Sequence, residues 1–168
     1  EIGRLEDSVI CYQNSLNIDP GFAEAQNNLG NVFREMDQQD DAINCFKEAI
    51  KLKPDYVEAY NNMRIALPGM IFNKPSRELQ KTIVSLLDRK TYARPIDITR
   101  AAISLLKFEP SLQKHLQLVD AIAIESPLDI ISELDKLHLL RKLMGVCPLP
   151  DLEFEKLFKQ LRASILEN

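Results

Sequence analysis

The sequence predicts an all-α protein in which helix–turn–helix repeats are continued by a segment of five further helices. Three observations predict this fold class. Apolar residues recur at the spacing of amphipathic helices, and no stretch shows the alternation that is typical of a half-buried strand. A pattern within residues 1–67 repeats after 34 residues. Proline, glycine and short polar clusters separate the apolar stretches and predict the turns.

The repeat is visible when the chain is shifted by 34 residues against itself. Aromatic then aligns with aromatic, aliphatic with aliphatic and amide with amide. The aligned pairs are Cys11 with Cys45, Tyr12 with Phe46, Leu16 with Ile50, Ile18 with Leu52, Phe22 with Tyr56, Ala25 with Ala59, Asn27-Asn28 with Asn61-Asn62, and Leu29 with Met63. So many matches in one register do not arise from composition, so we expect structural repeats.

The pattern resembles the tetratricopeptide repeat, a helix–turn–helix unit of 34 residues with the pattern W-x2-L-G-x2-Y, A-x3-F, P. The complete unit here, residues 23–56, lacks only the tryptophan and reads Gln26-x2-Leu29-Gly30-x2-Phe33, Ala42-x3-Phe46, Pro54. The resemblance implies that residues 1–67 form half a unit, one full unit and the first helix of a third, residues 57–66. Because the chain opens halfway through a unit, we expect a fragment that further repeats precede.

Gly30 and its equivalent position predict where the regular repeats end. A glycine in the middle of a helix costs about 1 kcal/mol relative to alanine, so we expect a closely packed partner helix there. In the third unit Arg64 replaces that glycine, and an arginine prevents such close packing. We therefore predict two domains, a repeat region at residues 1–67 and an α-helical segment at residues 68–168 that caps the open end of the solenoid.

The five helices of residues 68–168 follow from start and stop signals. Ser76 caps the first, which runs to about residue 90, and Asp97 caps a short second helix. Pro110 starts the third, Ser126-Pro127 starts a fourth that runs to Met144 and stops at Gly145, and Asp151 opens the last. Residues 93–98 and 150–157 resemble helical leaders that precede methyltransferase or glycosyltransferase domains in bacterial repeat proteins.

Composition and charge exclude several classes of function. The net charge of −4 gives no indication of nucleic acid as a partner, and no apolar run approaches the roughly 18 residues that cross a bilayer. The five glycines are isolated, so no phosphate-binding loop is present. Residues 1–67 hold six Lys and Arg against twelve Asp and Glu, a net charge of −6, whereas residues 68–168 hold fifteen against thirteen.

Cysteine and histidine offer little for catalysis or metal binding. Cys11, Cys45 and Cys147 are far apart and contain no C-x-x-C pair, which favours buried or idle thiols in a reducing compartment and hence a cytoplasmic protein. His115 and His138 lie on different predicted helices, and the sequence places no nucleophile beside either. We therefore predict a protein that is not an enzyme and that needs neither cofactor nor metal.

Polar residues mark one face of the first helix of the complete unit. At 100° per residue they fall within an arc of roughly 120°, opposite Leu29 and Phe33. These residues are Glu24, Asn27, Asn28, Asn31, Arg34 and Glu35, and the next unit repeats the start of the series with Glu58, Asn61 and Asn62. The series resembles the asparagine ladder of the superhelices attached to O-linked N-acetylglucosamine transferases, where amides hold the backbone of an extended peptide.

We therefore predict a non-catalytic scaffold whose concave groove binds a protein or an extended basic peptide. Asn28 and Asn62 are expected one repeat apart on the same contact line, because an amide pairs with a peptide N–H and C=O together. A solvated polar face is the alternative, although it favours Glu, Lys or Gln over asparagine. Two further alternatives are the substrate-presenting part of a larger methyltransferase or glycosyltransferase, and a self-assembly module that uses the leucine-rich helices.

Overall fold

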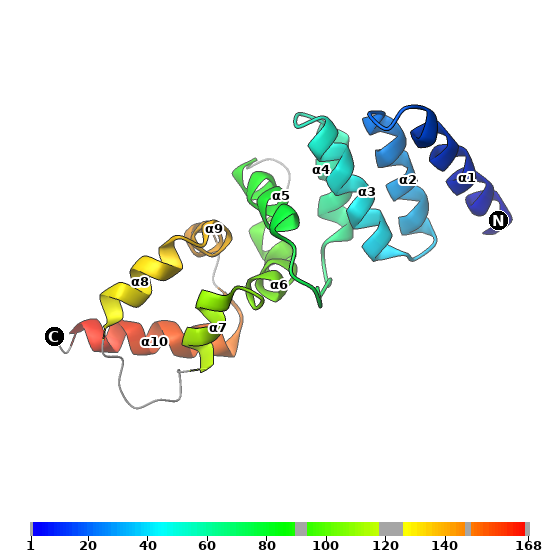
Figure 1. Cartoon of the computed structure of the whole chain (residues 1–168). Coiled ribbons are helices and arrows are strands. Elements are labelled where there is room, and N and C mark those ends of the chain that lie inside the picture. The colour runs from blue at the N-terminus through cyan, green and yellow to red at the C-terminus, as the bar shows by residue number, and fades with distance from the viewer. Residues whose placement is uncertain (1, 90–93, 118–125, 147–148, 167–168) are drawn as a thin grey trace. The chain divides into compact units, whose positions relative to one another are not determined.

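The computed structural model describes residues 2–89, 94–117, 126–146 and 149–166, which form ten helices and no strand (Figure 1). The predicted all-α class is therefore confirmed. The chain divides into two compact units. The first comprises residues up to Pro68 together with Arg89, and the second comprises the remaining described residues from Gly69 onward. None of the described helices combines the length and apolar composition that crossing a bilayer requires.

The first unit is a row of four helices that follow one another in space as they do along the chain (Figure 1). They are α1 (Ile2–Ile18), α2 (Ala23–Glu35), α3 (Gln39–Leu52) and α4 (Val57–Ala66). Each packs against the next, and α2 also contacts α4, its counterpart one repeat later. The last helix has the bounds that the 34-residue register predicts, so the repeat pattern sets the helix boundaries.

Gly30 lies where α2 and α3 come closest. A Cβ atom added to Gly30 would stand 2.6 Å from Cε1 and 2.8 Å from Cδ1 of Phe46, whose side chain is fully buried. Ala42, one helical turn before Phe46, is also fully buried. The expectation of a closely packed partner helix at this glycine is therefore confirmed, because the Phe46 ring occupies the space of the missing side chain.

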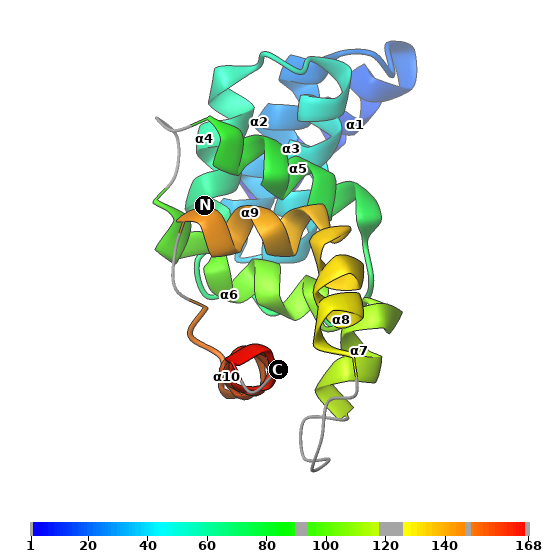
Figure 2. The same cartoon turned by 90° about the vertical axis from the view of Figure 1, so that its left-hand side faces the viewer.

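The second unit consists of six shorter helices. They are α5 (Arg77–Asp88), α6 (Pro95–Leu106), α7 (Pro110–Gln117), α8 (Pro127–Asp135), α9 (His138–Val146) and α10 (Leu152–Leu166). Helix α9 packs against α5, α6 and α8, while α10 packs against α7 and α8 (Figure 2). The buried side chains are mainly leucine, as in the row Leu139, Leu140 and Leu143 on α9.

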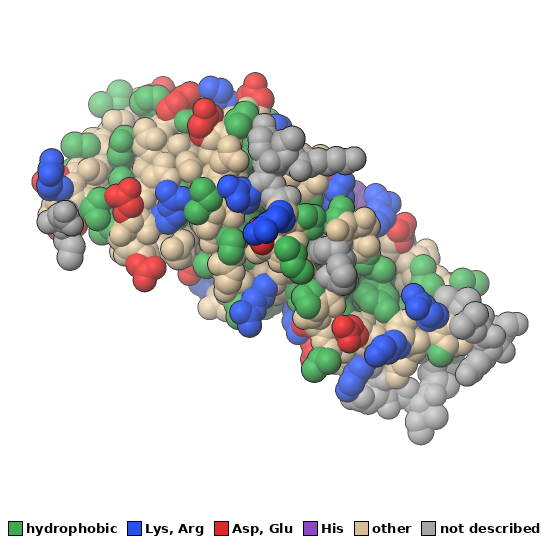
Figure 3. Space-filling model, turned by 180° about the vertical axis from the view of Figure 1, so that it is seen from behind, with side chains coloured by type: hydrophobic (Ala, Val, Ile, Leu, Met, Phe, Trp, Pro, Cys, Tyr) green, Lys and Arg blue, Asp and Glu red, His purple; other side chains and the backbone are tan. Residues whose placement is uncertain are grey.

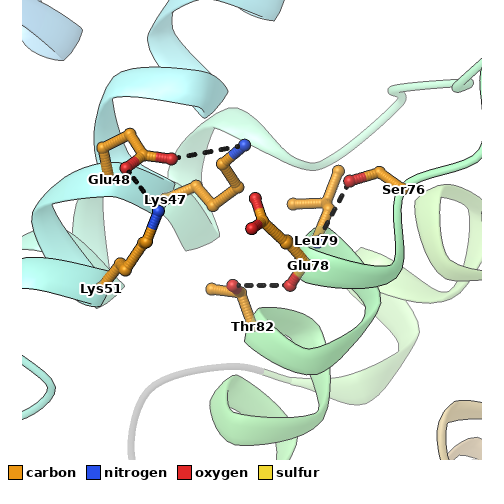
Figure 4. Close-up of polar contacts among 7 residues, drawn as sticks. All are labelled: Lys47, Glu48, Lys51, Ser76, Glu78, Leu79 and Thr82. Atoms are coloured by element: carbon orange, nitrogen blue, oxygen red, sulfur yellow. Dashed lines mark hydrogen bonds and ion pairs between the residues drawn. The ribbon is translucent and has the colours of Figure 1, made fainter.

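Two of the predicted capping residues close the helix starts in the second unit. The Leu79 amide donates to Oγ of Ser76 at 3.2 Å, and Thr82 Oγ1 donates to the Glu78 carbonyl one turn further along α5 (Figure 4). Asp151 Oδ1 accepts from the Glu153 amide at 3.1 Å at the start of α10. Helix α6 differs, since it begins at Pro95 rather than at Asp97.

One predicted helix is two helices in the structure. The stretch from Ser126 to Met144 breaks at Lys136 and Leu137, where the amides bond to carbonyls only three residues back and tighten the last turn of α8. The Arg141 amide then bonds to the Leu137 carbonyl and α9 begins. No glycine or proline marks this break, and Gly145, the predicted stop, lies inside α9. The second unit therefore has one more helix than the sequence predicts.

Candidate functional site

The predicted polar residues lie on α2 and α4, the first helices of two successive repeats. Asn28, Glu35 and Glu58 are exposed, and Glu24, Asn31, Arg34, Asn61 and Asn62 are half-buried. Asn27 is the exception, because only 4% of its surface is exposed. The side chains of the series therefore differ in how far a ligand could reach them.

Asn27 and Asn62 are bonded to each other. Asn62 Nδ2 on α4 donates to Asn27 Oδ1 on α2 at 2.9 Å, across one repeat. The 34-residue register aligns Asn62 with Asn28 and Asn61 with Asn27, but it does not reveal that the second amide of one pair bonds back to the first amide of the preceding pair. The expectation that Asn27 lines an open groove is corrected, since this buried amide joins two repeats.

Asn28 and Asn61 keep their amides free. Neither side chain makes a hydrogen bond or other polar contact with a described residue. Asn31 lies between these extremes: its Oδ1 is buried and has no hydrogen-bond partner in the described chain. An acceptor left in this state costs free energy, so a donor that reached it would be favoured.

Lys53 and Tyr56 border the same surface and were missed in the sequence. Lys53 Nζ bonds to Glu24 Oε1 at 3.1 Å and lies 5.0 Å from the centre of the Tyr56 ring. The hydrogen bond from Lys53 lowers the pKa of the Glu24 carboxyl, and in turn Glu24 raises the pKa of Lys53. Burial, followed by the charges of Glu24 and Glu58, raises the pKa of the Tyr56 hydroxyl. The signal was available in the sequence, because Lys53-Pro54 ends the complete unit.

Arg89 holds the turn between α3 and α4 within the first unit. Its Nη2 donates to the Pro54 carbonyl at 2.6 Å, and its guanidinium lies 4.4 Å from the centre of the Tyr60 ring. Lys53 and Arg89 thus both fix the segment that leads into α4, the helix that carries Asn61 and Asn62. On the second helix of the complete unit, Lys47 and Lys51 pair with Glu48 (Figure 4).

The titratable groups that could serve catalysis are arranged for packing. His115, 5% exposed, places Nε2 2.7 Å from Glu133 Oε2 and joins α7 to α8, while His138 is exposed. Burial raises the pKa of the Cys45 thiol to about 12, Cys11 is exposed, and Cys147 lies outside the described residues. No cluster of three or more His, Cys, Asp or Glu side chains suited to a metal ion occurs in the described ranges.

Comparison with known families supports the repeat. A family model for the tetratricopeptide repeat matches residues 11–44, and a second model, for the TPR repeat, matches residues 30–63. No curated protein and no solved structure matches the chain. Residues 11–63 are thus tetratricopeptide repeats, which confirms the resemblance seen in the sequence. The resemblance of residues 68–168 to transferase leaders stays a prediction. Tetratricopeptide families are generally non-catalytic scaffolds for protein interaction.

Proposed function

We propose that the surface of α2 and α4 binds an extended peptide by pairing with its backbone. The observation that carries the proposal is the state of the asparagines on this surface. Asn28 and Asn61 present unpaired amides, and Asn31 holds an unpaired acceptor beside them on α2. Each amide supplies both donor and acceptor, as a peptide backbone does, so the match depends little on the side chains of the peptide.

The pair formed by Asn27 and Asn62 supports the proposal by fixing the spacing of the two helices. A rigid surface loses less conformational entropy on binding than a mobile one. Asn62 also keeps its carbonyl oxygen and one amide hydrogen outside this pair, so it stays a candidate contact. Asn27 is buried, and we assign it a positioning role alone.

Charge favours a basic peptide. The negative net charge of residues 1–67 is only partly neutralised at the surface, because Lys53 pairs with Glu24 whereas Glu58 and Glu35 are exposed. Arg34, half-buried on the same face, opposes this trend locally. We therefore expect basic peptides to bind more tightly than acidic ones, with an affinity that falls as salt is added.

The experiment compares an asparagine variant with a matched control on extended peptides of equal positive charge and unrelated sequence. Asn28→Ala/Asn61→Ala should weaken binding by about 1–3 kcal/mol, or roughly 5- to 150-fold, if each side chain gives one net hydrogen bond. The control, Asn17→Ala/Asn44→Ala, removes exposed asparagines from α1 and α3 and should leave the affinity unchanged. Isothermal titration calorimetry measures both.

Two results would contradict the proposal. One is an affinity that stays the same in Asn28→Ala/Asn61→Ala while the protein remains folded. The other is a loss that affects a single peptide sequence only, because pairing with the backbone predicts similar losses for all. A thermal melt of each variant checks the fold, and we expect no loss of stability, since alanine is the better helix former.

A further inference from the structure

A hollow of about 440 Å³ lies among α8, α9 and α10 of the second unit. This volume falls within the roughly 300–1,000 Å³ that is typical of pockets for small ligands. Its wall is apolar and its rim is charged. The wall consists of Ile131, Leu134, Leu140, Met144, Phe158 and Leu161, and the rim of Asp135, Arg141 and Arg162.

The rim carries an excess of positive charge. Arg141 Nη1 lies 3.7 Å from Asp135 Oδ2, too far for a hydrogen bond, and both side chains are about 60% exposed. Arg162 makes no ion pair with any described residue. One arginine is therefore free, and the other is held loosely by a single hydrated carboxylate, so the rim can accept an anion.

Part of the apolar wall is in contact with water. Met144 is 51% exposed and Ile131 38% exposed, although their neighbours Leu134, Leu140 and Leu161 are buried. Methionine adapts its shape to an irregular ligand because it is unbranched and polarisable. Figure 3 shows that basic and hydrophobic side chains lie next to one another on one face of this unit.

We propose that this hollow binds a small molecule with an apolar chain and one carboxylate, of the fatty-acid class. The chain would fill the space between the three helices, and the carboxylate would bond to Arg162 and Arg141 at the rim. A protein partner fits less well, because a stable interface needs about 800 Å² from each side and the hollow is bounded by nine residues. The proposal is independent of peptide binding by the first unit.

The test titrates the full chain with decanoate below its micelle concentration, and follows the heat of binding. We expect saturable binding at one site per chain. Butyrate, which keeps the carboxylate but has little apolar chain, should not bind measurably, and decanol, which lacks the charge, should bind more weakly. Decanoate that binds no better than butyrate would overturn the proposal, because the apolar wall would then contribute nothing.

Variants locate the site. Arg162→Gln should weaken decanoate binding by about threefold, the value typical of a partly hydrated charge pair, and Met144→Glu should abolish it through like-charge repulsion. Arg100→Gln is the matched control, since Arg100 is an exposed arginine on α6 without an ion pair in the described chain and does not border the hollow. Both rim residues are exposed or lie at the edge, so the variants should fold.

Three outcomes would overturn the inference. Decanoate affinity that is the same in Arg162→Gln, Met144→Glu and the parent would place binding elsewhere. Equal losses in Arg162→Gln and Arg100→Gln would indicate general attraction to positive charge. Binding to vesicles of phosphatidylglycerol without binding to decanoate would point to a membrane surface in place of a single molecule.

Discussion

The two units of this chain use different means to hold their helices together. In the first unit, equivalent positions 34 residues apart perform specialised tasks: Gly30 admits the Phe46 ring, and Asn62 bonds to Asn27 across one repeat. In the second unit no such register exists, and short helices share a core built mainly of leucine. The comparison teaches that repeated sequence restricts individual contacts, whereas a leucine core restricts mainly the apolar face of each helix.

Glycine substitutions should show the largest difference between the units. Gly30→Val places three carbons against a fully buried ring, so we expect a loss of roughly 3 kcal/mol in the free energy of unfolding. Gly145→Val on α9 is the matched control, because a Cβ atom there meets nothing within 4 Å. It should change stability by no more than about 0.5 kcal/mol. Urea unfolding of both variants measures the two values, and equal losses would refute the contrast.

The amide pair predicts a smaller effect that depends on position. Asn62→Ala leaves the buried Asn27 carbonyl without its donor, which should cost about 1–2 kcal/mol of stability after the gain in helix propensity. Asn61→Ala, its neighbour on α4, removes an unpaired amide and should leave stability unchanged or slightly higher. A melt in which both variants behave alike would show that the pair does not hold the repeats together.

Each unit also contains one carboxylate whose stabilising effect depends on pH. Hydrogen bonds from Lys53 and from His115 lower the pKa values of Glu24 and Glu133, respectively. A carboxyl with a lowered pKa stabilises the folded state fully above its ordinary pKa near 4.5, and this contribution disappears as the pH falls through the lowered value. Both groups are well exposed, so we expect small effects that salt reduces.

Substitution separates the two carboxylates. Glu24→Gln and Glu133→Gln should each make the free energy of unfolding less dependent on pH below about 4.5, while stability at pH 3 stays close to that of the parent. Far-ultraviolet circular dichroism during urea unfolding at pH 3 and pH 6 measures the difference. A parent-like pH dependence in both variants would contradict the assigned pKa shifts.

Residues 1–67 were predictable in detail because the repeat constrains them. The register gave the helix bounds and the close approach at Gly30. It did not reveal which of two adjacent asparagines turns inward, because that depends on the neighbouring helix. In the second unit the break at Lys136 and Leu137 has no marker in the sequence, and apolar periodicity continues across it. The pairing of His115 with Glu133 joins helices that no repeat relates. Capping of the repeats by residues 68–168 stays a prediction.

The central claim is that unpaired asparagine amides on α2 and α4 hold a peptide backbone. The most direct test follows the side-chain amide signals of the asparagines by nuclear magnetic resonance while an extended basic peptide is added. We predict that the signals of Asn28 and Asn61 move in proportion to the bound fraction, and that the signal of buried Asn27 moves least. A peptide that binds while the Asn28 and Asn61 signals stay in place, or that shifts signals of the second unit alone, would contradict the account.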